Sequence, residues 1–162
     1  MSSTTPITST LGQGEREVTG AALQSALVDL IDLSLVAKQA HWNVVGRNFR
    51  SVHRQLDELV SLARTYTDRV AERAAAIGVP PDGRVRTVAA GSALPEFAQG
   101  WQRDRDVIQA IVETLDVVAL RMRGRIDETD KTDLVTQDLF LEVTAKLEEA
   151  RWMWQAQLAE NE

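Results

Sequence analysis

The stretch that decides the fold runs over residues 41–73 and reads HWNVVGRNFRSVHRQLDELVSLARTYTDRVAER. Apolar residues recur along it at steps of three and four, which predicts a long amphipathic helix after Gly46. The stretch contains both histidines of the chain, His41 and His53, together with three carboxylates at helical spacings. Two imidazoles and three carboxylates suit a first-row metal such as iron, manganese or zinc.

The spacing of the three carboxylates predicts how such a site is assembled. Asp57 follows His53 by four residues, and Asp68 and Glu72 form a second four-residue pair, so each pair lies on one helix face. Asp57 and Asp68 are eleven residues apart, which separates them by roughly 16 Å along a helix axis, too far to bind one ion. A second, antiparallel copy across a two-fold axis would bring the His41, His53 and Asp57 set to the other set. The sequence therefore predicts a metal site shared between subunits.

The composition favours a helical, single-domain, cytoplasmic protein. The chain has 162 residues, of which 44% are hydrophobic and only 5% aromatic, and this balance favours helices over a sheet sandwich. A formal net charge of −6 argues against a protein that is basic overall. The absence of cysteine excludes disulfides, thiolate metal sites and cysteine nucleophiles. We find no signal-peptide pattern and no run of about 18 apolar residues, so no membrane span is expected.

Hydrophobic periodicity predicts four long helices behind a polar N-terminal tail. Residues 1–16 are rich in Ser and Thr and aperiodic, so we expect a mobile tail there and a bundle domain over 17–162. The predicted helices cover residues 17–43, 49–77, 101–126 and about 133–159. Asn48 is placed to cap the second helix, and Gly78 to end it.

The crossover between the second and third helices, residues 78–100, is too long for an ordinary loop. Within it, Ser92–Ala98 is predicted to form a short helix, with Ser92 as its cap and Pro95 in its first turn. Four helices with one long crossover after the second describe an all-α, ferritin-like four-helix bundle. On periodicity alone, a bundle without any chemistry is an equal alternative.

The candidate ligands also allow a purely structural interpretation. A histidine on an amphipathic helix is more often part of the packing than a ligand. The same helix carries four arginines that could neutralise the carboxylates in salt bridges: Arg54, Arg64, Arg69 and Arg73. The concentration of both histidines and two carboxylate-containing sets in one short stretch favours the metal site over this alternative.

A di-iron centre within a single chain is disfavoured. Centres of that kind use Glu-x-x-His on two helices of one bundle together with further glutamates. Here the residues three positions before His41 and His53 are Lys38 and Arg50. The arrangement of ordinary ferritins and rubrerythrins is therefore not expected.

The pattern His41-Trp-Asn-Val-x-Gly-x-x-Phe-x-x-x-His53-x-x-x-Asp57, followed by Asp68-x-x-Ala-Glu72-Arg73, resembles the signature of the Dps proteins, or mini-ferritins. Near the far end, the segments Thr136-Gln-Asp138-Leu and Arg151-Trp-Met-Trp-Gln-Ala-Gln-Leu158 are similar to the last helix of that family. The resemblance extends over about residues 18–160, so it leaves only the N-terminal tail outside.

This resemblance implies a function. Members of the family form hollow homo-dodecamers that oxidise Fe²⁺, preferably with hydrogen peroxide, at two-fold interfaces and store the ferric mineral. The family's iron ligands match His41, His53, Asp57, Asp68 and Glu72 without departure. Trp42 beside them would intercept stray radicals, although packing at the interface is an equal interpretation.

The resemblance also implies an iron-entry pore. Asp133 and Asp138, with Asp130 less closely, are similar to the residues that line the family's pores on three-fold axes. Carboxylates at a helix N-terminus are stabilised by the helix dipole, so ordinary capping is the alternative.

DNA is a further partner to consider, because members that bind it strongly often use basic tails. In the first seventeen residues Arg16 is the only basic side chain, and the C-terminus closes with Ala-Glu-Asn-Glu162. We therefore expect weak, salt-sensitive DNA binding, with avidity from repeated surface arginines such as Arg84 and Arg86 or from the twelve amino termini of a dodecamer. The competing functions are a ferroxidase cage that protects DNA by removing iron and peroxide, a nucleoid-associated protein that compacts DNA, and a structural oligomer without chemistry.

Overall fold

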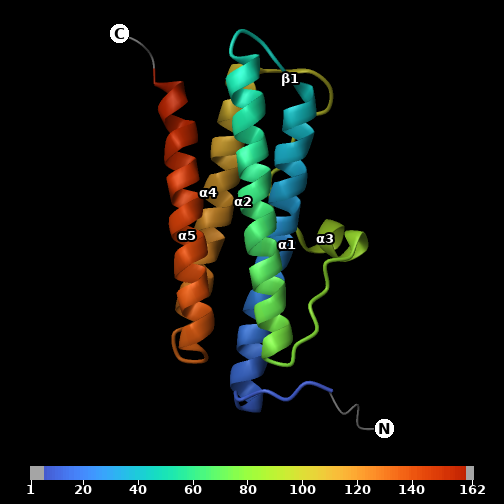
Figure 1. Cartoon of the computed structure of the whole chain (residues 1–162), viewed down its shortest axis with the longest axis vertical. Coiled ribbons are helices and arrows are strands. Elements are labelled where there is room, and N and C mark those ends of the chain that lie inside the picture. The colour runs from blue at the N-terminus through green and yellow to red at the C-terminus, as the bar shows by residue number, and fades with distance from the viewer. Residues whose placement is uncertain (1–5, 160–162) are drawn as a thin grey trace.

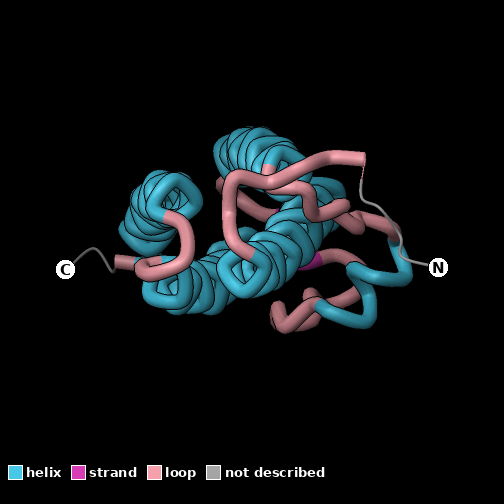
Figure 2. Tube along the Cα trace, turned by 90° about the horizontal axis from the view of Figure 1, so that it is seen from below, coloured by secondary structure: helices cyan, strands magenta, loops and turns pink. Residues whose placement is uncertain are grey.

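The computed structural model describes residues 6–159, and four long helices lying side by side dominate it (Figure 1). Seen from the end, these helices form one bundle with the crossover helix on its flank (Figure 2). The helices are α1 (Gln13–Asn43), α2 (Phe49–Ala76), α3 (Val85–Gly91), α4 (Asp104–Thr129), α5 (Leu134–Gln155) and the 3₁₀ turn η1 (Ala156–Leu158). The predicted all-α four-helix bundle with a short helix in the crossover is confirmed.

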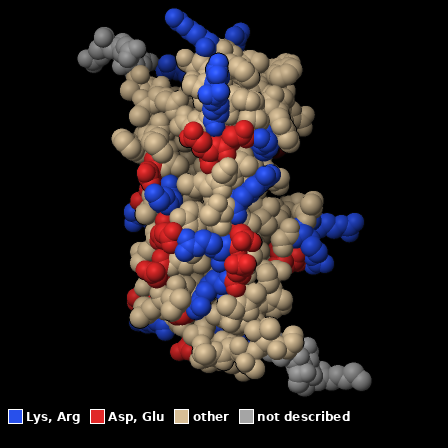
Figure 3. Space-filling view, in the orientation of Figure 1, with Lys and Arg blue, Asp and Glu red and all other residues tan. Residues whose placement is uncertain are grey.

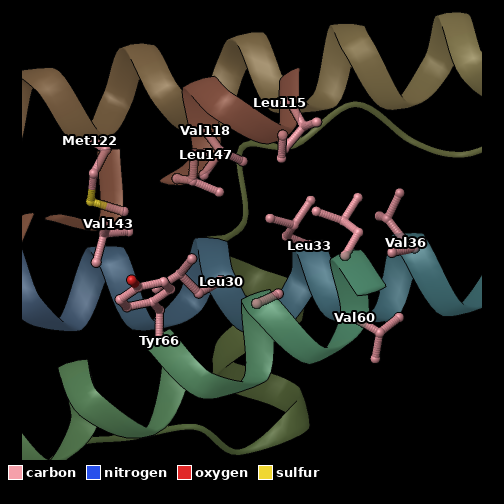
Figure 4. Packing of buried hydrophobic residues seen from close by; sticks show 14 of the residues in the cluster. Leu30, Leu33, Val36, Val60, Tyr66, Leu115, Val118, Met122, Val143 and Leu147 are labelled. Atoms are coloured by element: carbon pink, nitrogen blue, oxygen red, sulfur yellow. The ribbon is translucent and has the colours of Figure 1, made fainter. Parts of the chain in front are cut away.

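One apolar core fills the interior between the four long helices. Leu33 of α1, Leu115 of α4 and Leu147 of α5 are completely buried, and Val60 of α2 is nearly so. Figure 4 shows Leu33, Leu115 and Leu147 facing one another in the interior. Burying a leucine or valine side chain contributes about 1.5–3 kcal/mol, so the periodic apolar stripes account for the bundle.

Helix α1 is more apolar than the sequence analysis anticipated. By length and composition alone it could cross a membrane, contrary to the expectation that no such segment exists. Within its most apolar window, however, 67% of the residues are buried inside the bundle. The helix packs against α2, α3 and α4, so its apolar character matches the position of a core helix.

A buried ion pair joins α1 to α4. Asp29 is fully buried and accepts hydrogen bonds from Arg125 and, at 2.8 Å, from Arg121 Nε. Burial lowers the pKa of the Arg125 guanidinium, and the charge of Asp29 opposes that effect. Removing one partner of such a pair costs about 3–5 kcal/mol because it leaves the other charge buried alone.

The N-terminal helix begins earlier than predicted. Residues 1–5 of the predicted tail lie outside the described residues, but α1 already begins at Gln13 rather than near Glu17. The Glu15 side chain accepts the backbone N–H of Gly12 at 3.0 Å, which satisfies one of the free donors at a helix start. Leu11, also in the predicted tail, packs against the core.

The short crossover helix was predicted at the wrong place. It covers Val85–Gly91, and the predicted segment Ser92–Ala98 is not helical. Asp82 accepts the backbone N–H of the N-cap residue Arg84 at 3.0 Å and the Thr87 hydroxyl at 2.8 Å, although the N-cap side chain itself forms no capping hydrogen bond. Pro95 disfavours helical geometry at Leu94, which lies within the non-helical segment 92–98.

The turn between α1 and α2 is held by the start of α4. Strand β1 (Val44–Val45) pairs in parallel with β2 (Gln102–Arg103), which replaces the predicted first turn of the third helix. Asp104 Oδ2 accepts the backbone N–H of Asn48 at 2.7 Å, whereas the Asn48 side chain makes no capping hydrogen bond, contrary to prediction. Gly46 lies in the turn between β1 and Asn48, and its backbone φ is +133°.

We predict that Gly46→Ala destabilises the fold. A Cβ at this position would lie 2.7 Å from the Asp104 carboxylate, and the backbone conformation disfavours any L side chain. Strain of this kind costs about 1–3 kcal/mol, measurable as a lower free energy of unfolding in urea. Gly124→Ala is the control, because an added Cβ there meets nothing within 4 Å and the helix interior gains up to about 1 kcal/mol. Equal stability of the two variants would contradict the role of the turn.

Candidate metal centre

The two histidines lie face to face where α1 ends and α2 begins. Their ring centroids are 3.6 Å apart and their planes are inclined by 21°. His41 Nδ1 lies 2.8 Å from the main-chain carbonyl of His53, and His53 Nδ1 lies 2.8 Å from that of His41. The α1–α2 turn brings the ends of the two helices together, so residues twelve positions apart bond reciprocally.

This reciprocal bonding determines which ring nitrogen is available to a ligand. A carbonyl oxygen only accepts hydrogen bonds, so each Nδ1 must carry a proton. In a neutral imidazole the other nitrogen, Nε2, is then unprotonated and presents a lone pair, which is the state that binds metals. Fixing a histidine through its other nitrogen is also the usual way in which proteins orient metal-binding imidazoles. Phe49, 4.9 Å from His53 between ring centroids, packs against the outer face of the stack.

Asp57 places a carboxylate beside the histidine pair. Its Oδ1 lies 3.5 Å from His41 Nδ1 and 2.5 Å from the Lys38 ammonium. The hydrogen bond from Lys38 holds the pKa of Asp57 below its ordinary value, against a smaller opposing effect of desolvation. The carboxylate is therefore ionised at neutral pH, and Lys38 occupies a position where a cation is favoured.

The second carboxylate pair, Asp68 and Glu72, lies on the exposed surface of α2. Two of the arginines that could have neutralised these residues bond to α5 instead. Arg69 Nη1 lies 2.5 Å from Glu142, and Arg73 Nη2 lies 2.5 Å from Asp133. Within residues 6–159, neither Asp68 nor Glu72 forms an ion pair.

The two halves of the predicted site remain apart within one chain. Helix α2 runs without interruption from Phe49 to Ala76, so helical rise separates Asp57 from Asp68 by roughly 16 Å. In the part of the chain that the structure describes, no three His, Asp or Glu side chains converge on one ion-sized position. His41, His53 and Asp57 are brought together, and Asp68 and Glu72 form a separate set.

Trp42 projects from the end of α1 next to His41. Its side chain is 63% exposed, whereas His41 is 7% exposed. The indole therefore contributes little to the core of its own subunit. Its position beside the histidine pair suits either of the two roles expected from the sequence.

The three predicted pore residues occupy different environments. Asp133 is buried and caps α5 by accepting the backbone N–H groups of Val135 and Thr136, at 3.3 and 3.2 Å. Asp130 is exposed and accepts a hydrogen bond from Gln137 at 3.2 Å. The third residue, Asp138, is exposed and lines an open hollow of about 370 Å³ between α2 and α5.

That hollow also connects the pore candidates with the metal site. Glu72 lines it together with Asp138, and Arg69 and Arg73 form part of the same wall. Both arginines are paired with other carboxylates, Glu142 and Asp133. The carboxylates of Glu72 and Asp138 therefore give the hollow a negative charge that these arginines do not neutralise. Asp138 thus lies near one predicted iron ligand within the same subunit.

Two residues that matter for this geometry were missed in the sequence. Lys38 precedes His41 by three residues, so helical spacing places both side chains on one face of the first helix. Because His41 and Asp57 were expected in the same half-site, this spacing could have indicated that Lys38 contacts Asp57. Asp104 holds the α1–α2 turn from 56 positions away, and no local pattern could have revealed that contact.

Comparison with known proteins first defines the class. The family model of the ferritin-like domain matches residues 20–162. With the four-helix bundle and its crossover helix, this match makes the chain a ferritin-like protein.

Within that class the chain belongs to the Dps family. The DNA protection during starvation protein of Mycolicibacterium smegmatis is 37% identical over 143 residues, which are 84% of this chain and 74% of that protein. DNA protection during starvation protein 2 of Deinococcus radiodurans is 36% identical over 135 residues, 83% of this chain but only 56% of that longer protein. A solved structure of Dps from Microbacterium arborescens in the high iron form superposes with a TM-score of 0.88 at 34% identity, covering 95% of this chain and 99% of that one.

We predict that Asp133 and Asp138 differ in their effect on stability. Asp133→Ala removes the α5 cap and leaves Arg73 without its partner, so the free energy of unfolding should fall by about 1–3 kcal/mol. Asp138→Ala on the exposed surface should change it by less than about 0.5 kcal/mol. Chemical unfolding of both variants at neutral pH measures the difference.

The pH dependence supplies a control for the first variant. Burial raises the pKa of Asp133, but hydrogen bonds from Arg73 and Thr136 together hold it below its ordinary value. The stabilisation is therefore complete above the unfolded-state pKa of about 4 and is lost as the pH falls through the lowered folded-state value. The gap between wild type and Asp133→Ala should narrow in acid; a constant gap would argue against the ionised cap.

Proposed function

We propose that this chain is the subunit of a ferroxidase cage that oxidises Fe²⁺, preferably with hydrogen peroxide, and stores the ferric product. Membership of the Dps family supports this function, as does the iron-loaded relative from Microbacterium arborescens. The observation that carries the proposal is the reciprocal bonding of His41 and His53, which leaves the Nε2 lone pair of each of the two stacked rings available to a metal. Iron is the substrate here.

Each predicted ligand has a distinct role in the oxidation. The neutral imidazoles of His41 and His53 bind Fe²⁺ without adding charge, and the ionised Asp57 offsets the charge of the ion. Carboxylates favour the harder Fe³⁺, so they stabilise the product relative to the substrate. Two Fe²⁺ ions supply the two electrons that break the O–O bond of one peroxide, and two protons complete the formation of two waters.

Lys38 has the role of a counter-ion before iron arrives. Its ammonium lies where positive charge stabilises Asp57. Binding of Fe²⁺ to Asp57 then exchanges one cation for another. The negative charge of the carboxylate is therefore balanced by a nearby cation both before and after iron binds. The cost of moving Lys38 is small, because its side chain is partly exposed and surface ion pairs contribute little to stability.

A complete site requires a second copy of the chain. The partner's Asp68 and Glu72 would close the site around an ion held by His41, His53 and Asp57, across a two-fold axis. The helical separation of the two sets on α2 and the lack of arginine neutralisation at Asp68 and Glu72 support this arrangement. Six such two-fold interfaces, two on each of the three two-fold axes of a tetrahedral homo-dodecamer, would give the hollow assembly that storage needs.

Protection of DNA follows from the same chemistry. Fe²⁺ and peroxide that meet in solution release hydroxyl radical, which cleaves DNA. A two-electron reaction at a closed site consumes both reagents without releasing that radical. The names of the relatives, DNA protection during starvation proteins, support this role for the chain.

Combining His53→Ala with Asp57→Ala should abolish rapid oxidation of Fe²⁺ by peroxide. The substitutions remove one imidazole and one carboxylate of the same half-site, and the folded bundle should persist because neither residue belongs to the apolar core. Stopped-flow absorbance of ferric species after anaerobic loading measures the rate, and a spin trap reports hydroxyl radical. A wild-type rate in this variant would show that the site lies elsewhere.

Complementation tests whether two chains share the site. A second variant, Asp68→Ala with Glu72→Ala, should be equally inactive by itself. Hybrids refolded from a mixture of the two variants should regain activity, since some interfaces then combine two intact half-sites. A failure of hybrids that demonstrably form would contradict a shared site.

Iron entry through a carboxylate-lined pore forms a separate part of the proposal, with Asp138 as its main residue and Asp130 beside it. Asp138→Asn should slow the uptake of Fe²⁺ severalfold at low ionic strength, because a ring of carboxylates concentrates cations. The effect should diminish as salt is raised. Asp133 is not substituted in this test, since its capping role would confound the result. Unchanged uptake at low salt would place the entrance elsewhere.

A further inference from the structure

The end of the bundle that carries the α1–α2 turn concentrates positive charge. Segments 44–54 and 101–106 contain five arginines and two aspartates, although the whole chain has a net charge of −6. In Figure 3 basic side chains project from the tip of that end. The charge of this surface is therefore opposite to that of the molecule as a whole.

Over the described residues, the absence of an ion pair distinguishes four of these five arginines from most others of the chain. Elsewhere seven arginines form ion pairs with carboxylates: Arg69, Arg73, Arg84, Arg121, Arg123, Arg125 and Arg151. Across the described range 6–159, no carboxylate pairs with Arg47, Arg50, Arg54 or Arg103. Their charges are thus available to an external anion.

The fold gathers these arginines from two distant segments. Arg47, Arg50 and Arg54 line one open hollow of about 470 Å³. The β1–β2 pair brings Arg103 close to this hollow, because Arg103 lies opposite Val45. Val45 in turn precedes Arg47 by two residues. We call these four residues the turn arginines.

Little negative charge offsets the turn arginines. Asp104 follows Arg103 directly, but its carboxylate accepts the backbone N–H groups of Asn48 and Arg105, at 2.7 and 2.9 Å. The first turn of α2, which carries Arg50, contains no acidic residue. An anion approaching Arg50 therefore meets no carboxylate in the first turn of α2. The nearest carboxylates on that helix are Asp57 and Glu58, one turn beyond Arg54.

We propose that the turn arginines form the surface through which this protein contacts the phosphate backbone of DNA. The inference rests on the proposed DNA-protecting function and adds the residues that bring the protein to DNA. Guanidinium groups bind phosphates in a bidentate geometry, and such contacts release counterions regardless of base sequence. One such surface per subunit lets an oligomer contact DNA several times, so weak individual contacts add up.

This assignment differs from the expectation for Arg84 and Arg86. Arg84 donates two side-chain hydrogen bonds to Asp82, at 2.9 and 2.7 Å, and the bonded pair lowers its attraction for phosphate. The two positions therefore provide a matched control, with the same number of arginines removed from a different surface.

The experiment compares two double variants of the full-length assembled protein. Arg47→Gln with Arg50→Gln should weaken binding to a DNA duplex at least about tenfold at low salt and flatten the salt dependence of affinity. Arg84→Gln with Arg86→Gln should stay within about twofold of wild type. Fluorescence anisotropy with two duplexes of unrelated sequence measures both, and the two duplexes should give equal affinities.

Additional variants and measurements distinguish DNA contact from a change of oligomeric state and from binding to anionic lipid. Arg47→Lys with Arg50→Lys should restore most of the affinity, because charge is retained, and sedimentation should show the same oligomer for every variant. An unchanged affinity of the glutamine variant, an equal loss in both double variants, or a loss that accompanies a changed oligomer would overturn the proposal. So would variant-sensitive binding to phosphatidylserine vesicles without binding to DNA.

The iron assay keeps this inference separate from the ferroxidase proposal. The Arg47→Gln, Arg50→Gln variant should oxidise Fe²⁺ with peroxide at the wild-type rate. Conversely, the inactive His53→Ala, Asp57→Ala variant should bind DNA as wild type does. Each variant should thus lose one activity and keep the other. A wild-type protein that shows only one of the two activities would identify the proposal that has failed.

Discussion

The continuity of α2 is the constraint on which the rest of the site depends. One unbroken helix carries His53, Asp57, Asp68 and Glu72, and its rise per residue keeps the first two away from the last two by roughly 16 Å. No rearrangement of side chains closes that gap, and a kink would need a proline, a glycine or a bulge that residues 49–76 do not contain. The chain therefore carries two halves of different sites, and the chemistry of iron becomes linked to assembly.

The first half-site depends in turn on how the α1–α2 turn is held. Gly46 adopts a conformation that other residues disfavour, and Asp104 receives the Asn48 N–H in the space that a side chain would fill. The turn brings the helix ends close enough for His41 and His53 to exchange hydrogen bonds with each other's main chain. Ring orientation and tautomer are thus set by backbone atoms before any metal arrives, and little reorganisation remains for binding.

Much of this architecture could be predicted from the sequence because it follows from local rules. Helical periodicity located the four long helices to within a few residues, and four-residue spacings identified the paired ligands. Contacts between distant segments were not predictable. Asp104 holds a turn in another part of the chain, and Asp133 bonds to Arg73 sixty positions away. The position of α3 was also missed, although the contact of Asp82 with Thr87 in its first turns is a local one. For this helix the sequence offered a capping serine at Ser92, but a carboxylate earlier in the crossover provided more hydrogen bonds.

The distribution of arginine pairing connects the iron site with the outer surface. On α2, Arg69 and Arg73 are drawn to Glu142 and Asp133 of α5, and this leaves Asp68 and Glu72 unneutralised. The ion pairs of Arg69 and Arg73 with α5 also stabilise the bundle. Keeping these two cations away from Asp68 and Glu72 therefore does not lower the stability of the fold. At the other end of α2 the turn arginines have no such partners, and their charge remains uncompensated. One helix thus presents free carboxylates to a cation and free guanidiniums to a polyanion, several turns apart. In the proposed functions, that separation would keep Asp68 and Glu72 away from DNA phosphates and the turn arginines away from the Fe²⁺ that these two carboxylates bind.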